Sequence, residues 1–175
     1  MRVIGLSGWS GAGKTTLLAR LIPHLTAKGL LVSTMKHAHS NFDVDVPGKD
    51  SWLHRQAGAT EVLVSSGRRW ALMHELRGAP EPPFAELLLK MSRVDILIVE
   101  GFKANPHPKI EVHRAANGKP LMFPNDSTII GVTADIPVET ALPFAYLDDI
   151  PAIAQMISAL AVRIEDVLAH EAAGA

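Results

Sequence analysis

A run of eight residues close to the N-terminus has the types and spacing of a phosphate-binding loop. The run 8–15 reads Gly-Trp-Ser-Gly-Ala-Gly-Lys-Thr and fits the pattern G-x-x-x-x-G-K-[ST] at every position. Its glycines let backbone N–H groups approach phosphate oxygens, its lysine suits the β- and γ-phosphates, and its threonine hydroxyl suits Mg²⁺. We therefore predict a nucleoside triphosphate site, with contacts from Ser10, Gly11, Ala12, Gly13, Lys14, Thr15 and Thr16.

Phosphoryl chemistry at such a loop also needs a carboxylate, to hold the metal's water ligands or to orient the attacking water. Glu100 follows an apolar run and precedes Gly101, which predicts a place at the carboxyl end of a buried strand, where parallel sheets bind ligands. We predict that Glu100 serves catalysis and, with Thr15, the metal, and a carboxylate that only caps a turn is the alternative. Asp45, in a polar loop after another predicted strand, is a second catalytic candidate, although a solvated loop aspartate fits equally well.

The nucleobase is harder to infer, because the usual guanine-reading motif Asn-Lys-x-Asp is absent. Asp135 ends a buried run, where a base-reading aspartate would lie. A carboxylate accepts two hydrogen bonds from the N1–H and the exocyclic amine of guanine, and adenine does not offer that pair. Asp135 is therefore our candidate for guanine recognition, and an aspartate that starts a turn before Pro137 is the alternative.

A metal cluster is a possible reading of the segment after the second predicted strand. His37 and His39 lie near Asp43 and Asp45, and such residues can hold a metal ion. Histidines at a strand end that bond to loop backbone are the favoured interpretation.

The arginines bear on the rate of hydrolysis. The sequence places no evident arginine beside the glycine-rich loop, and an arginine that reaches the γ-phosphate raises the rate by roughly 10³–10⁵. We therefore expect slow hydrolysis, with Arg55, Arg68 and Arg69 as the remaining candidates.

Strands and helices alternate along the chain, which predicts an α/β protein. We expect a P-loop NTPase-like three-layer fold with a mainly parallel sheet, an antiparallel hairpin, and a single nucleotide-binding domain over residues 1–175. Pro23 should kink the first helix or end it early. The last helix should run unbroken from the Asp149 region to Leu168. The predicted strands are 3–7, 31–35, 61–65, 69–73, 95–99, 109–113 and 129–133, and the other helices are 15–28, 50–57 and 84–91.

Composition excludes several classes of function. The 175 residues contain no cysteine, so a disulfide framework, a thiolate metal site and a cysteine nucleophile are all excluded. The formal net charge of -1 does not favour nucleic-acid or anionic-membrane binding. The longest uncharged apolar stretch, residues 150–162, is shorter than the roughly 20 residues of a membrane span. We expect a cytoplasmic protein that binds neither nucleic acid nor membrane.

Several further blocks, taken in order, resemble the MobB family of molybdopterin-guanine dinucleotide biosynthesis adapter proteins. They are the glycine-rich loop through Thr16, Met-Lys-His-Ala-His at 35–39, Asp-Val-Asp-Val-Pro-Gly-Lys-Asp-Ser at 43–51, Ala-Gly-Ala at 57–59, Arg-Trp-Ala-Leu-Met at 69–73, Val-Glu-Gly-Phe-Lys at 99–103 and Pro-Lys-Ile at 108–110. The resemblance implies phosphate contacts from residues 11–16, a role for Glu100, and nucleotide or cofactor contacts from residues 36–50.

The same resemblance implies a function. It implies a homodimeric GTP-binding protein with Mg²⁺ and weak GTPase activity, which assists the nucleotidyltransferase MobA in joining GMP to molybdopterin. Two alternatives stay open from the residues alone. One is a P-loop small-molecule kinase that acts on a cofactor precursor, and the other is a scaffold with a vestigial site, against which the intact Lys14 and Thr15 argue.

Overall fold

The computed structural model describes residues 1–38 and 42–174, and the chain divides into two compact units. The P-loop unit comprises Met1–His37 and Phe84–Ala175, and the insert unit comprises Ala38–Pro83. Within the described ranges, no helix is long and apolar enough to cross a membrane. The single domain expected over the whole chain stays a prediction.

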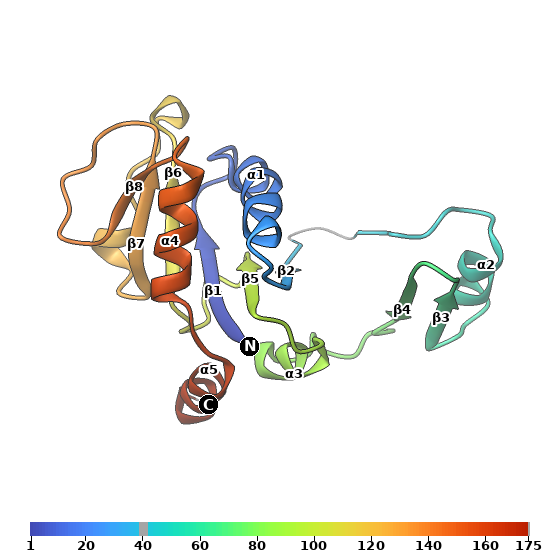
Figure 1. Ribbon diagram of the computed structural model, residues 1–175. Helices are drawn as coiled ribbons and strands as arrows, with labels where there is room; N and C mark the ends of the chain where they lie inside the picture. Colours follow the sequence, from blue (N-terminus) through green and yellow to red (C-terminus); the bar gives the residue numbers. More distant parts are fainter. Residues whose placement is uncertain (39–41, 175) are drawn as a thin grey trace. The chain divides into compact units, whose positions relative to one another are not determined.

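A parallel sheet forms the centre of the P-loop unit (Figure 1). Its order is β2-β5-β1-β6-β7-β8, and the short β9 pairs antiparallel with β1. Leu6 of β1 lies between Glu100 of β5 and Ile110 of β6, so these three strands end at the same edge of the sheet. The strands are β1 (Arg2–Ser7), β2 (Val32–Lys36), β5 (Ile96–Glu100), β6 (Lys109–His113), β7 (Ile129–Ala134), β8 (Phe144–Tyr146) and β9 (Val162–Arg163).

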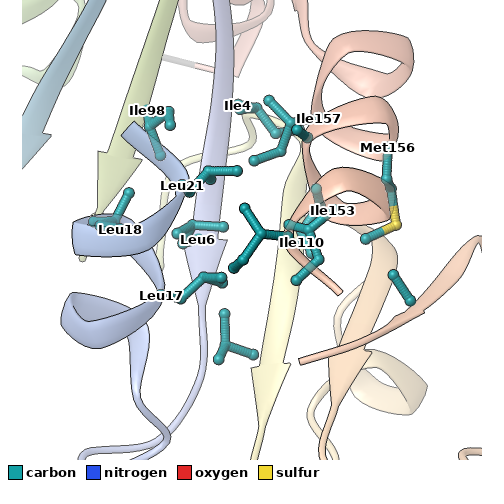
Figure 2. Close-up of a cluster of buried hydrophobic side chains, with 14 of the residues drawn as sticks. Ile4, Leu6, Leu17, Leu18, Leu21, Ile98, Ile110, Ile153, Met156 and Ile157 are labelled. Atoms are coloured by element: carbon teal, nitrogen blue, oxygen red, sulfur yellow. The ribbon is translucent and has the colours of Figure 1, made fainter. Parts of the chain in front are cut away.

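Apolar side chains alternate between the two faces of this sheet, and each face is covered by helices. Ile4 and Leu6 of β1 pack in one cluster with residues of α1 (Lys14–Ala27) and α4 (Ile150–Leu160), as Figure 2 shows. Val3 packs in a second cluster with residues of α3 (Phe84–Lys90) and α5 (Ile164–Gly174). The sheet therefore lies between two helical layers, which confirms the predicted α/β fold.

The insert unit contains one helix and one hairpin. The helix is α2 (Asp50–Gln56), and β3 (Glu61–Ser65) pairs antiparallel with β4 (Trp70–His74). The antiparallel hairpin expected from the sequence is confirmed.

The structure corrects two expectations about helices. Helix α1 contains Pro23 and continues to Ala27, with Leu21 and Leu25 on either side of the proline buried in the core, so the early end is excluded and a kink stays a prediction. The prediction of a continuous C-terminal helix was wrong, since α4 ends at Leu160 and β9 follows. Helix α4 packs on one face of the sheet and α5 on the other, so the chain passes from one face to the other between them. As it does so, its backbone pairs with Arg2 and Val3 at the start of β1.

Candidate nucleotide site

The glycine-rich loop connects β1 to α1 and has a backbone that requires glycine. Gly8 has φ 143°, and a Cβ there would lie 2.4 Å from the carbonyl oxygen of Val112. Gly13, with φ 93°, immediately precedes α1, and among the described residues no side chain caps the first turn of that helix. The first N–H groups of α1 and the positive end of its dipole are thus available to an anion.

Lys14 is held within this loop by its own backbone. Its Nζ donates hydrogen bonds to the carbonyl oxygens of Gly8, at 2.9 Å, and Trp9, at 3.1 Å. Burial, together with the neighbouring Lys103 and Lys36 ammonium groups, lowers the pKa of Lys14, while the Glu100 carboxylate acts in the opposite direction. A bound phosphate would add the negative charge that this group of cations lacks.

Glu100 is the last residue of β5 and lies at the same sheet edge as the loop. It is half-buried and stands opposite Leu6 in β1 and Lys36 in β2. The next residue, Gly101, has φ 100°, and its backbone passes so close to His37 that a Cβ there would lie 2.7 Å from the His37 Cβ. The structure therefore brings Glu100 and Lys14 together, while the catalytic and metal roles of Glu100 and Thr15 stay predictions.

Asp135 follows β7 at the same edge of the sheet. Its Oδ1 accepts a hydrogen bond from the backbone N–H of Ala115 at 2.8 Å, and its Oδ2 lies 3.8 Å from Nη1 of Arg114. The turn that begins at Ala115, η1 (Ala115–Asn117), is thus tied to Asp135. The base-reading role of Asp135 stays a prediction.

Two residues beside the loop were missed from the sequence. The Nδ2 of Asn117 donates to the carbonyl oxygen of Ser10 at 3.1 Å. A Cβ on Gly13 would lie 3.3 Å from Nη2 of Arg114. Arg114 directly follows β6 and Asn117 ends the turn η1 after it, and β6 neighbours β1, so the rule that singled out Glu100 at the end of β5 would have found them if the strand order had been known.

Trp9, the second residue of the glycine-rich loop, adds an aromatic ring to the site. Its indole N–H donates to the carbonyl oxygen of Pro120 at 2.8 Å. The Nζ atoms of Lys103 and Lys119 lie 5.7 and 6.0 Å from the centroid of its ring, within range of a cation–π interaction. The surroundings of the loop are therefore positively charged, as a polyphosphate site requires.

The candidate residues of the insert unit are engaged with one another. Asp45 accepts hydrogen bonds from Ser51 Oγ at 2.8 Å and from Arg55 Nε at 3.2 Å, and Arg55 also binds Asp43 and Glu75. The catalytic role of Asp45 stays a prediction. His39 lies outside the described residues, and within them no cluster of His, Asp or Glu could hold a metal ion.

A parallel sheet, a glycine-rich loop that holds a lysine, and a helix whose uncapped first turn follows that loop together define a class of protein. This class is the P-loop proteins of α/β architecture, which bind nucleotides through the loop.

Comparison with known proteins narrows the class to one family. The model of the family "Molybdopterin guanine dinucleotide synthesis protein B", or MobB, matches residues 3–135, and the chain belongs to this family. The molybdopterin-guanine dinucleotide biosynthesis adapter protein of Haemophilus influenzae is 40% identical over 159 residues, covering 89% of this chain and 86% of that protein. The adapter protein of Escherichia coli is 38% identical over 158 residues, covering 89% of this chain and 90% of that protein.

A solved structure agrees with this assignment. A crystal structure of a molybdopterin-guanine biosynthesis protein B superposes with a TM-score of 0.71 at 26% identity, covering 90% of this chain and 99% of that one. The matches support the interpretation as an adapter in molybdopterin guanine dinucleotide synthesis and not the kinase alternative.

Proposed function

We propose that this protein is a GTP-binding adapter with weak GTPase activity, which assists the attachment of GMP to molybdopterin in the synthesis of molybdopterin guanine dinucleotide. The observation that carries the nucleotide site is the Lys14 ammonium, held 2.9 Å from the Gly8 carbonyl oxygen in a loop that ends at an uncapped helix. Similarity to adapter proteins of this pathway supports the biological role.

Mg²⁺ is proposed to accompany the nucleotide. The Thr15 hydroxyl and the Glu100 carboxylate are oxygen donors, which Mg²⁺ prefers, so this donor set fits the ion. When bound, the ion would neutralise charge on the β- and γ-phosphates. Glu100 is assigned the catalytic role because it lies close enough to Lys14 to oppose the lowering of that lysine's pKa. Asp45 is the second candidate.

Slow hydrolysis has support from the insert unit. Arg55 is one of the arginines considered for the γ-phosphate. Its guanidinium donates hydrogen bonds to Asp43, Asp45 and Glu75. Releasing it would leave carboxylates without their partner, so Arg55 is unsuited to act as a mobile cation.

A titration of GTP, ATP and GDP, with and without Mg²⁺, tests the nucleotide site. Lys14→Ala should weaken GTP binding by roughly 100-fold, because charge-assisted bonds to phosphate are lost, and should leave the circular dichroism spectrum unchanged. Lys28→Ala, an exposed lysine just after the same helix, is the matched control. Unchanged GTP affinity in Lys14→Ala would refute the site.

The same titration tests guanine recognition. Asp135→Asn should weaken GTP relative to ATP, because an amide cannot accept both guanine hydrogen bonds. An equal loss for the two nucleotides would remove Asp135 from base reading.

A homodimer and a complex with MobA complete the proposal, which places the protein in the cytoplasm as a single domain. The hairpin of the insert unit supports the dimer, because Leu63, Trp70 and Leu72 lie on one face of it and are 62%, 66% and 49% exposed. Exposed apolar patches of this kind mark interaction sites. Co-elution with MobA in gel filtration tests the second interaction.

A further inference from the structure

The side chain of Arg114 lies against the glycine-rich loop, and we propose that it binds the α- or β-phosphate of the nucleotide as a second cation beside Lys14. This inference rests on the proposed function, because it adds a residue to the same nucleotide site. It concerns a residue that the loop motif does not include.

The position of the guanidinium is set by the backbone around it. Arg114 directly follows β6, the strand beside β1, so it leaves the sheet next to the loop. A Cβ on Gly13 would lie 3.3 Å from Nη2, 3.6 Å from Nε and 3.9 Å from Cζ of Arg114. The whole guanidinium plane is therefore adjacent to Gly13, the residue just before α1, whose first turn has no side-chain cap among the described residues.

The location beside Gly13 selects the phosphates that Arg114 can reach. The backbone N–H groups of a P-loop cradle the α- and β-phosphates, whereas the lysine extends to the γ-phosphate. A guanidinium beside that backbone thus meets the inner phosphates and not the γ-phosphate that hydrolysis transfers. Its planar array of N–H donors suits two phosphate oxygens at once.

The contacts of Arg114 within the protein leave its guanidinium available. Among the described residues its only ionic partner is Asp135, at 3.8 Å, and the side chain is 40% exposed. An ion pair of this length and exposure contributes little to stability. The turn itself is held by hydrogen bonds that do not use the Arg114 side chain, since Ala115 N–H donates to Asp135 Oδ1 and Asn117 N–H donates to the Arg114 carbonyl oxygen.

Binding of GTP and of inorganic pyrophosphate to the full chain tests the proposal, because pyrophosphate has no base. Arg114→Ala should weaken GTP, GDP and pyrophosphate by a similar factor of roughly 10- to 100-fold. Arg114→Lys should retain part of the affinity, because the ammonium keeps the charge but not the planar array of donors. Arg20→Ala, which removes an exposed arginine paired with Asp148 in the same unit, is the control.

The alternatives give different results. If Arg114 only positions Asp135, GTP binding will fall while pyrophosphate binding is unchanged, and the proposal is overturned. A loss confined to turnover would also overturn it and would make Arg114 a γ-phosphate residue.

Arg114→Gln, which removes the charge and keeps hydrogen-bonding groups, replaces the alanine variant if that variant does not fold. If wild-type protein binds no GTP, the proposed function itself fails, whereas loss of both ligands in Lys14→Ala but not in Arg114→Ala rejects this inference alone.

Discussion

The P-loop unit packs apolar side chains on both faces of its sheet, whereas the insert unit buries only Val62 among its described apolar residues. The insert unit has a charged centre instead, where Arg55 bonds to Asp43, Asp45 and Glu75. The phosphate loop, with backbone geometry that must be accurate, is built on the densely packed unit. This arrangement suits a site whose donors have to be held in place before the ligand arrives.

The difference indicates what each unit depends on. Burial of apolar surface contributes about 25 cal/mol per Å², and the P-loop unit has two buried apolar clusters from which to draw it. A two-stranded hairpin is at best marginally stable by itself. Helix α2 packs beside β3, and the hairpin face that carries Leu63, Trp70 and Leu72 is exposed, whereas Val62 on the other face is buried. This exposed apolar face is the surface on which the proposed homodimer would form.

The largest effect should come from one leucine in each unit. Leu21→Ala removes a fully buried side chain of α1 and should lower the free energy of unfolding by about 3 kcal/mol. Leu63→Ala, at an exposed position, should change it by about 0.5 kcal/mol or less in dilute protein. Urea unfolding measures both, and equal losses would contradict the difference between the two units. If the cost of Leu63→Ala grows with protein concentration, the hairpin lies in the interface of the proposed dimer.

Acid should weaken the P-loop unit first. Burial, together with the Lys109 ammonium, lowers the pKa of His107 to about 3. Below pH 6.5 the imidazole of His107 is protonated in the unfolded chain but stays neutral in the folded chain. The free energy of unfolding therefore falls as the pH falls. Between pH 6.5 and pH 5 the loss should be about 2 kcal/mol. His107→Leu should abolish that part of the pH dependence, with the exposed His170→Gln as control, and an unaltered slope would contradict the assignment.

The insert unit should keep its ion pairs over the same range. The Arg55 guanidinium holds the pKa of Asp43 below its usual value. Partial burial acts to raise the pKa of Asp45, but hydrogen bonds from Ser51, Val46 and Arg55 outweigh it and lower that pKa. Both depressed values mean that this contribution to stability is present above the unfolded pKa and is lost only as the pH falls through the folded one.

The smallest effect should be a local opening caused by the loss of Arg55. Arg55→Gln should speed hydrogen exchange of the β3 and β4 amides and leave that of β1 and β5 unchanged, because the two units have separate cores. Arg68→Gln, an exposed arginine in the hairpin turn, is the matched control. Faster exchange throughout the sheet would mean that the units are not independent.

Local patterns accounted for most of the strands and for the phosphate loop. The loop motif, the apolar run before Glu100 and the turn at residues 66–69 are each encoded within about ten neighbouring residues, so one sequence suffices to find them. The same patterns failed at the C-terminus. Apolar residues at helical spacing continue from Ile150 to Leu168, but spacing cannot tell which face of the sheet each half covers.

The sequence by itself determined the chemistry of the site: glycines, a lysine and a threonine in an order that suits phosphate and Mg²⁺. The sequence also suggested Glu100 and Asp135, but which strands flank the loop, and hence that Arg114 and Asn117 lie beside it, came from the fold. Glu100 lies near Lys14 because β5 pairs with β1, and Arg114 lies against Gly13 because β6 pairs with β1 on the other side. Strand order depends on contacts between segments about a hundred residues apart in the chain, and no local pattern of residue types records that choice.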